Sequence, residues 1–229
     1  MTTVLITGAN RGIGLELSQQ YIANGDRVYA CCRNPEAADV LTALANSSDG
    51  KVTIHTMDVS SEDSIKACAE ELSGVSIDVL INNAGVYGGE HQAFGDANLD
   101  DWLMTLQVNT IGPFRVAEAL QQHLKSANEP KMLTISSQVG ASTFSMPIYA
   151  YSSSKAAVNK VMQILATEWQ QYGISVSLIH PGWVKTEMGG SEAAITPQES
   201  AEGIRQVIEK MDMANTGSFF KWNGEIHPW

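Results

Sequence analysis

A tyrosine and a lysine stand four positions apart at Tyr151 and Lys155, and together they could move a proton. In a helix both side chains project from one face. A phenol with an ordinary pKa of about 10 is a poor acid or base at neutral pH unless a nearby cation favours its ionised form. Lys155 could supply that cation. The pair alone is a common coincidence, and Tyr149, which has Ser153 at the matching position, is the weaker candidate.

Hydroxyl and amide groups come from other parts of the chain. The run TISSQVG contains Ser136 and Ser137 at the end of an apolar segment. Neighbouring strand residues face opposite sides, so we expect one of these two serines to face a site. The run HPGWVKT, ending at Thr186, follows another apolar segment. Asn109 lies in a helical stretch, where asparagine is usually solvated or bonded to its own backbone.

Three glycines, Gly8, Gly12 and Gly14, follow the first apolar segment in the run TGANRGIG. At a turn from strand to helix, glycines let the backbone approach a pyrophosphate and aim helix N–H groups at it. The spacing GxxxGxG differs from the commoner GxGxxG, and glycines alone are also compatible with a simple tight turn. The apolar segment before and the helical pattern after favour a nucleotide site.

The second apolar segment predicts which nucleotide is bound. It ends ACCRN, with Arg33 where an acidic residue would bind a free ribose 2′-hydroxyl. Arg33 and Arg11 could together bind a 2′-phosphate, because guanidinium groups match phosphate geometry. The sequence therefore favours NADP(H) over NAD(H). The alternative is that Arg33 is a solvated loop charge.

Short apolar runs alternate with helical stretches and must position these groups. We expect strands at residues 3–7, 27–32, 52–57, 77–81, 132–136 and 174–179, and a last strand with an Asn223-Gly224 turn within 217–229. Helices are expected at 12–24, 35–46, 62–72, 113–126 and 156–171, and from near Pro197. This pattern predicts an α/β fold: a Rossmann-type, doubly wound parallel sheet of about seven strands, with helices on both faces. Ligands bind such sheets at the carboxyl ends of the strands.

Composition excludes several classes of protein. The 229 residues suit a single domain over 1–229, and a net charge of -11 argues against binding nucleic acid or an anionic membrane. No apolar run is long enough to span a membrane, and the first residues lack the pattern of a signal peptide. Three cysteines make no disulfide framework, so we expect a cytoplasmic location. The five histidines lack metal-ligand spacing, so we expect no metal.

With these motifs in order, the chain resembles the short-chain dehydrogenase/reductase family along nearly its whole length. The matching runs are TGANRGIG, Asp58-Val59, NNAG at 82–85, Asn109, Ser137 with Gly140, Tyr151 with Lys155, and Pro181-Gly182 to Thr186. Within the family, YAYSSSKAAVN and HPGWVKTEMGG are similar to the cytosolic carbonyl-reductase-like branch that includes C-factor and sniffer proteins.

The resemblance implies catalytic roles for Asn109, Ser137, Tyr151 and Lys155. Tyr151 would exchange a proton with the carbonyl oxygen, and Lys155 would lower its pKa and bind the nicotinamide ribose. Ser137 would orient the carbonyl, and Asn109 would hold a water that links Lys155 to solvent. Family members often place the serine one residue nearer the tyrosine, where this chain has Gln138. Ser137 fits the Ser-x-x-Gly pattern, and Ser136 stays open as the alternative.

The resemblance also implies a cofactor-binding set, in which Asp58 lies beside the adenine, Asn83 and Gly85 beside its ribose, and Val184 and Thr186 beside the nicotinamide amide. The full set is Gly8, Asn10, Arg11, Gly12, Ile13, Gly14, Arg33, Asp58, Val59, Asn83, Ala84, Gly85, Tyr151, Lys155, Pro181, Gly182, Val184 and Thr186.

Two functions remain open. The first is an NADPH-dependent reductase of an aldehyde, ketone or quinone, or the reverse alcohol dehydrogenase. The second is a dinucleotide-binding regulatory or signalling protein with little turnover. Only six residues, 191–196, separate Gly190 from the helix near Pro197, which predicts an open cleft. Homodimers or homotetramers are a family expectation. A substrate pocket could use Tyr87, His91, Phe94, Phe144, Met146, Trp183 and Met188.

Overall fold

Seven parallel strands form one sheet in the order β3-β2-β1-β4-β5-β6-β7 in the computed structural model, which describes residues 1–229. The strand order reverses between β1 and β4, which is where such sheets bind ligands. The strands are β1 (Thr3–Thr7), β2 (Arg27–Cys32), β3 (Val52–Thr56), β4 (Val79–Asn82), β5 (Lys131–Ile135), β6 (Ser175–His180) and β7 (Phe219–Lys221). The predicted fold class is confirmed, and the predicted strands differ only at their ends.

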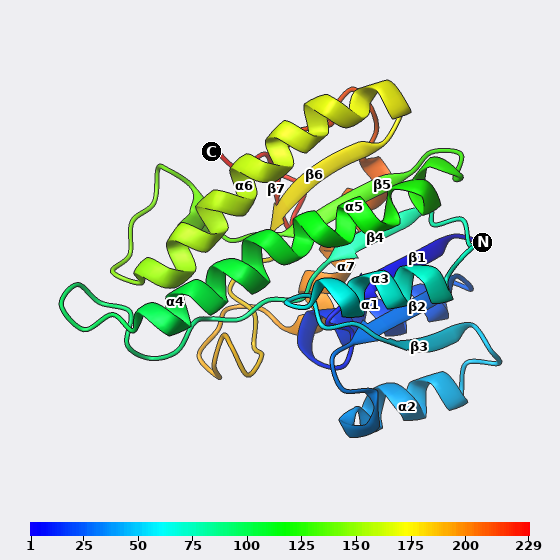
Figure 1. The fold of residues 1–229 in the computed structure, drawn as a ribbon, viewed down its shortest axis with the longest axis horizontal. Helices are drawn as coiled ribbons and strands as arrows, with labels where there is room; N and C mark the ends of the chain where they lie inside the picture. Colours follow the sequence, from blue (N-terminus) through cyan, green and yellow to red (C-terminus); the bar gives the residue numbers. More distant parts are fainter.

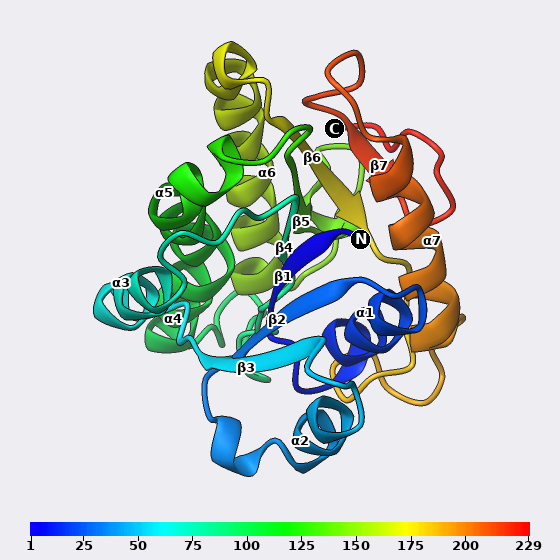
Figure 2. The ribbon, with the colours of Figure 1, turned by 90° about the vertical axis from the view of Figure 1, so that its right-hand side faces the viewer.

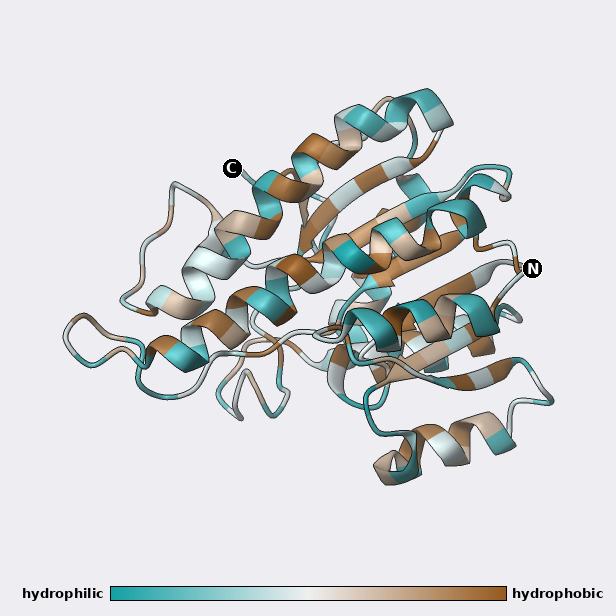
Figure 3. Cartoon of the chain, in the orientation of Figure 1, coloured by the Kyte–Doolittle hydropathy of each residue, from teal (hydrophilic) through white to brown (hydrophobic).

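Helices cover both faces of this sheet (Figures 1 and 2). On one face lie α1 (Gly12–Ala23), α2 (Asp39–Asn46) and α7 (Pro197–Lys210). On the other lie α3 (Glu62–Glu71), α4 (Leu99–Leu106), α5 (Gly112–Lys125) and α6 (Tyr149–Trp169). In hydropathy colours, apolar residues run along the strands, while the helices alternate apolar and hydrophilic stretches (Figure 3).

The strands are apolar because each one faces two hydrophobic cores. In β1, Leu5 belongs to the core under α3, α5 and α6, whereas Val4 and Ile6 belong to the core under α1, α2 and α7. All three side chains are fully buried. Successive side chains of a strand point to opposite faces, so a strand covered on both sides must be apolar throughout.

Three helical segments differ from the predictions. The predicted helix 35–46 is a 3₁₀ turn, Pro35–Ala37, followed by α2, because Ala38 adopts a non-helical backbone conformation between them. The predicted helix 156–171 already begins at Tyr149 as α6. The sequence did not predict α4, which Asn98 caps by accepting bonds from two backbone N–H groups in its first turn.

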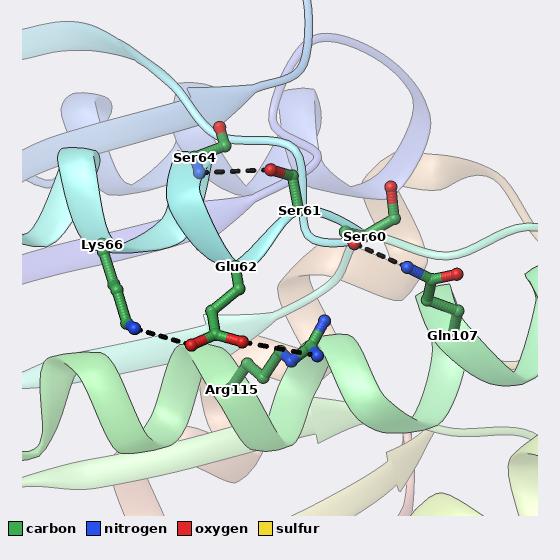
Figure 4. Close-up of polar contacts among 7 residues, drawn as sticks. All are labelled: Ser60, Ser61, Glu62, Ser64, Lys66, Gln107 and Arg115. Atoms are coloured by element: carbon green, nitrogen blue, oxygen red, sulfur yellow. Dashed lines mark hydrogen bonds and ion pairs between the residues drawn. The ribbon is translucent and has the colours of Figure 1, made fainter.

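A polar cluster ties α3 to α5 and to the π-helix Gln107–Ile111, which contains Asn109 (Figure 4). The Glu62 carboxylate accepts a bond from Lys66 Nζ (2.6 Å) and lies 3.5 Å from an Arg115 nitrogen. The Lys66 bond and the Arg115 charge lower the pKa of Glu62. Gln107 Nε2 donates to the Ser60 carbonyl (2.7 Å), so the π-helix is fixed against the loop that follows β3.

The last residues fold back over the edge strand β7. After a turn at Asn223-Gly224, His227 N–H donates to the Phe219 carbonyl (2.7 Å). The Phe219 ring lies 4.6 Å from His227 and 5.7 Å from Trp229, centroid to centroid. The Trp229 carbonyl accepts a bond from Ser142 Oγ (2.7 Å). Phe219 and Phe220 are therefore buried within the chain, whereas Ile226 stays exposed.

Candidate active site

Tyr151 and Lys155 lie in the first two turns of α6, beside the carboxyl end of β5. Lys155 is 4 % exposed, and its Nζ donates to the Ile135 carbonyl (2.9 Å) at the end of that strand. The same Nζ lies 5.6 Å from the centroid of the Tyr151 ring. The structure thus brings together the two side chains whose spacing predicted a proton-transfer pair.

The pKa values of this pair are set mainly by burial. Burial raises the pKa of Tyr151 to about 12, while a hydrogen bond with Ser137 opposes the rise and the charge of Tyr87 adds to it. Burial lowers the pKa of Lys155 to about 8. The sequence prediction gave Lys155 the task of lowering the phenol's pKa. In the structure Ser137 opposes the rise in that pKa, and Lys155 Nζ donates to the Ile135 carbonyl. The predicted effect of Lys155 on the phenol stays a prediction.

The two candidate serines have separate partners. The Ser137 hydroxyl lies near enough to the Tyr151 phenol to oppose the rise in its pKa. Ser136 is 1 % exposed and donates to Asn159 Oδ1, and Asn159 Nδ2 donates to the Gly140 carbonyl (3.2 Å). Ser136 therefore holds the turn after β5 against α6, and Ser137 is the serine placed at the site. A Cβ at Gly140 would lie only 2.7 Å from the backbone of Lys155, which accounts for a glycine there.

Asn109 fastens the loop after β4 to α6. Its Oδ1 accepts the Val86 N–H (2.8 Å), and its Nδ2 donates to the Val86 carbonyl (2.8 Å) and to Ser154 Oγ (3.0 Å). A Cβ at Gly85 would lie 3.2 Å from Asn109 Oδ1 and 3.7 Å from Lys155 Nζ. Asn109, Gly85 and Lys155 therefore lie close together. The sequence did not indicate the part played by Ser154. The predicted water-holding role of Asn109 stays a prediction.

The glycine turn between β1 and α1 is shaped for close backbone approach. Gly8 and Gly12 have φ angles of 65° and 54°, in the left-handed region that favours glycine. A Cβ at Gly14 would lie 2.3 Å from the Gly8 carbonyl oxygen, whose other neighbour is Asn83 Nδ2 (3.0 Å). No side chain caps the N-terminus of α1, and no acidic residue lies in its first turn. This arrangement fits a bound pyrophosphate.

The two predicted phosphate-binding arginines have different surroundings. Arg11, the N-cap of α1, forms an ion pair with Glu187 in the loop after β6. A Cβ at Gly12 would lie 3.3 Å from Thr186 Cγ2, so this loop crosses directly beside the glycine turn. Arg33 lies exposed just after β2. The clamp formed by both arginines stays a prediction, and the Glu187 pairing is a feature the sequence did not indicate.

The other predicted cofactor residues lie at the same edge of the sheet. Asp58, directly after β3, accepts bonds from the backbone and hydroxyl of Ser60 (2.9 and 2.6 Å). Val184 forms a parallel bridge with Ile195. The remaining members sit in the turn after β1 (Asn10), in the first turn of α1 (Ile13), and in the loops after β3 (Val59), β4 (Ala84, Gly85) and β6 (Pro181, Gly182).

Of the predicted pocket residues, Tyr87 lies beside the proton-transfer pair, with its ring centroid 5.3 Å from that of Tyr151. Trp183 is half-exposed, and its Nε1 donates to the Gly189 carbonyl (2.8 Å). Phe94 is 91 % exposed on the outer part of the loop after β4. No group of three or more His, Cys, Asp or Glu side chains forms a metal cluster, and none of the helices has the length and apolar character of a membrane span.

Comparison with known proteins identifies the family. Residues 2–196 match the family model described as short chain dehydrogenase, and the chain belongs to the short-chain dehydrogenase/reductase family of oxidoreductases. C-signal from Myxococcus xanthus is 35% identical over 167 residues, which cover 72% of this chain and 100% of that protein.

Two solved structures of carbonyl reductases match the whole fold. The NADPH-bound carbonyl reductase from chicken fatty liver has a TM-score of 0.92 and 31% identity, covering 100% of this chain and 99% of that one. The carbonyl reductase Sniffer of D. melanogaster has a TM-score of 0.93 and 30% identity, covering 100% of both chains. The similarity to the carbonyl-reductase-like branch is confirmed.

Proposed function

We propose that this chain is an NADPH-dependent oxidoreductase that reduces the carbonyl of an aldehyde, ketone or quinone to an alcohol, or catalyses the reverse reaction. The observation that supports it best is the Tyr151 phenol, which lies near the Ser137 hydroxyl and beside the buried Lys155 at the carboxyl edge of the sheet. The likeness to an NADPH-bound carbonyl reductase supports the same reaction class. Residues 1–229 would act as one nucleotide-binding domain.

NADP(H) is the proposed cofactor because the glycine turn and the uncapped α1 fit a pyrophosphate, while β2 ends at Arg33 instead of a carboxylate. Arg11 and Arg33 would bind the 2′-phosphate. Asp58, Asn83 and Thr186 would hold the adenosine and nicotinamide ends. When bound, NADPH supplies the hydride.

The residues of this chain handle the proton. With a pKa of about 12, Tyr151 is protonated at neutral pH and is ready to donate its proton to a carbonyl oxygen that gains negative charge. The Ser137 hydroxyl would orient that oxygen and stabilise its charge. Lys155, with a pKa of about 8, is largely charged at neutral pH, and this positive charge favours the phenolate left after transfer.

The segment that would cover the substrate, residues 191–196, is short. Residues 191–196 do not form a separate helix, and Ile195 pairs with Val184 while Ala193 is buried. This segment therefore packs against the loop after β6. Tyr87 offers aromatic surface beside the phenol, and the half-exposed Trp183 lies in the loop after β6. We propose an open cleft with a broad tolerance for small carbonyl compounds.

The test is the purified protein with NADPH and a panel of aldehydes, ketones and quinones. Wild type should oxidise NADPH with at least one of them, and Tyr151→Phe should abolish this rate. Equal rates in the two proteins would contradict the role of Tyr151. The second candidate, a dinucleotide-binding signalling protein, is favoured by the likeness to C-signal. Tight NADPH binding without turnover across the panel would support that candidate.

A homodimer or homotetramer stays a prediction, which light scattering can check. The cytoplasmic location predicted from the cysteines also stays a prediction; Cys31, Cys32 and Cys68 are all free thiols in the structure.

A further inference from the structure

Gln92 caps the first turn of α6 from outside the helix. The helix begins at Tyr149, and its N-cap residue Ile148 has no side chain that can accept a hydrogen bond. The first N–H groups of a helix have no partner within it. Gln92 supplies two of the missing acceptors: its backbone carbonyl accepts the Tyr149 N–H (3.2 Å), and its Oε1 accepts the Tyr151 N–H (2.9 Å).

The other end of the same side chain holds the loop beside the phenol. Gln92 Nε2 donates to the carbonyls of Tyr87 (2.9 Å) and Gly89 (3.0 Å), so both amide hydrogens are used. Gln92 is only 3 % exposed. The Tyr87 ring, in turn, lies 5.3 Å from the Tyr151 ring. One buried amide thus joins the turn that contains Tyr151 to the wall next to it.

The loop that Gln92 organises has no regular structure between β4 and α4. Asn109 holds its beginning through two bonds to Val86. At Gly89, with a φ of 78°, an added Cβ would lie 2.6 Å from Asp101 Oδ2, so the loop is also pressed against α4. Further along the loop, Gln92 connects it to α6.

We propose that Gln92 is a positioning residue that sets the Tyr151 phenol against Ser137 and keeps water from it, an inference that rests on the proposed reductase function. Gln92 touches neither the phenol oxygen nor Lys155, and it acts through the backbone of Tyr151 and Tyr87. A catalytic group displaced by about 1 Å loses about 100-fold in rate.

The test compares Gln92→Met with a matched control, Gln20→Met. Gln92→Met keeps the backbone bond to Tyr149 and removes the three side-chain bonds. Gln20 on α1 also bonds to another segment, the Gln198 carbonyl (3.1 Å), but on the opposite face of the sheet. We expect Gln92→Met to lower kcat about 10- to 100-fold. The NADPH Kd should stay within about twofold of wild type, because Gln92 has no contact with the glycine turn. Gln20→Met should change neither quantity.

A second variant and a second readout separate positioning from folding. Gln92→Glu keeps an acceptor for the Tyr151 N–H but cannot donate to the Tyr87 and Gly89 carbonyls, so its kcat should be intermediate. The ionisation of Tyr151 is measured by tyrosinate absorbance after a rapid pH jump, with Tyr151→Phe in each background as the blank. Gln92→Met should lower this pKa from about 12 towards the ordinary value, because water reaches the phenol.

The outcomes are distinct. A wild-type kcat and an unchanged Tyr151 titration in Gln92→Met would overturn the positioning role. A shifted titration in a protein whose wild type turns over no carbonyl would overturn the proposed function and leave the positioning role standing. If Gln92→Met fails to fold, the same two measurements on Gln92→Glu decide: an intermediate kcat with a shifted titration supports the proposal, and wild-type values for both refute it.

Discussion

Ser136→Ala and Ser137→Ala are expected to damage different properties of the protein, although the two serines are neighbours. Ser136 donates to Asn159 Oδ1, and both side chains are buried. Ser136→Ala leaves that oxygen unpaired, which costs about 1–3 kcal/mol. In a chain of this size each kcal/mol lowers Tm by about 2–4 °C. The variant should therefore melt several degrees lower while its kcat changes little.

Ser137→Ala should have the opposite signature. Its hydroxyl lowers the pKa of Tyr151, so the variant's phenol should ionise at still higher pH than in wild type. Loss of one hydrogen-bond donor to a developing oxyanion costs about 10²–10³ in kcat. The hydrogen bond that this hydroxyl accepts is a long one from Val139 N–H (3.4 Å), so Tm should change little.

The assay is NADPH oxidation with the most reactive carbonyl of the panel, together with thermal melting of each variant. Ser177→Ala is the matched control, because Ser177 is a buried serine of β6 whose hydroxyl has no hydrogen-bond partner. It should leave both kcat and Tm near the wild-type values. A larger loss of kcat in Ser136→Ala than in Ser137→Ala, at unchanged Tm, would refute the assignment of the two serines.

Three further changes test the cofactor site and the buried lysine. Arg33→Ala should weaken NADPH binding about tenfold and leave NADH binding unchanged in fluorescence titrations; a tenfold preference of wild type for NADH would refute the 2′-phosphate interpretation. Gly14→Ala should abolish cofactor binding, because its Cβ would lie 2.3 Å from the Gly8 carbonyl oxygen, and wild-type affinity would count against the pyrophosphate site. Lys155→Met should stabilise the protein at neutral pH. Burial lowers the pKa of Lys155 from its usual value to about 8, which costs the wild-type folded state about 3 kcal/mol. The variant is relieved of this cost but loses about 1 kcal/mol with the bond to the Ile135 carbonyl. Above pH 8 the folded wild type binds fewer protons than the unfolded state, so its stability rises with pH. The difference in unfolding free energy between Lys155→Met and wild type, measured by urea melts, should therefore shrink towards about pH 10. A difference that is constant with pH would contradict the lowered pKa of Lys155.

Local patterns predicted most of the fold. The strands were predictable because both faces of each strand are buried, which leaves continuous apolar runs such as that of β1. The break between the 3₁₀ turn and α2 at Ala38 was not predictable, because it depends on the backbone conformation of a single residue. The sequence does contain a signal for α4 in Asn98 and the two acidic residues that follow it, a common helix start.

Some residues of the candidate site were also predictable from local patterns, and others were not. Tyr151, Lys155 and the glycine turn have local spacing that points to their chemistry. Gln92 has none, since it lies in an irregular loop and its bonds reach α6 from far along the chain. The Glu187 partner of Arg11 is still more distant in sequence.

The sequence by itself determined the fold class and predicted the nucleotide turn and the proton-transfer pair, because these depend on residue types at short, regular spacing. Only the tertiary structure separates the surroundings of Ser136 and Ser137, since it places the Ser136 hydroxyl on Asn159 and the Ser137 hydroxyl near Tyr151. The catalytic role of Ser137 stays a proposal. The tertiary structure also showed that burial dominates the pKa values of Tyr151 and Lys155. Burial and long-range hydrogen bonds arise from the whole packed chain, and no local pattern of residues encodes them.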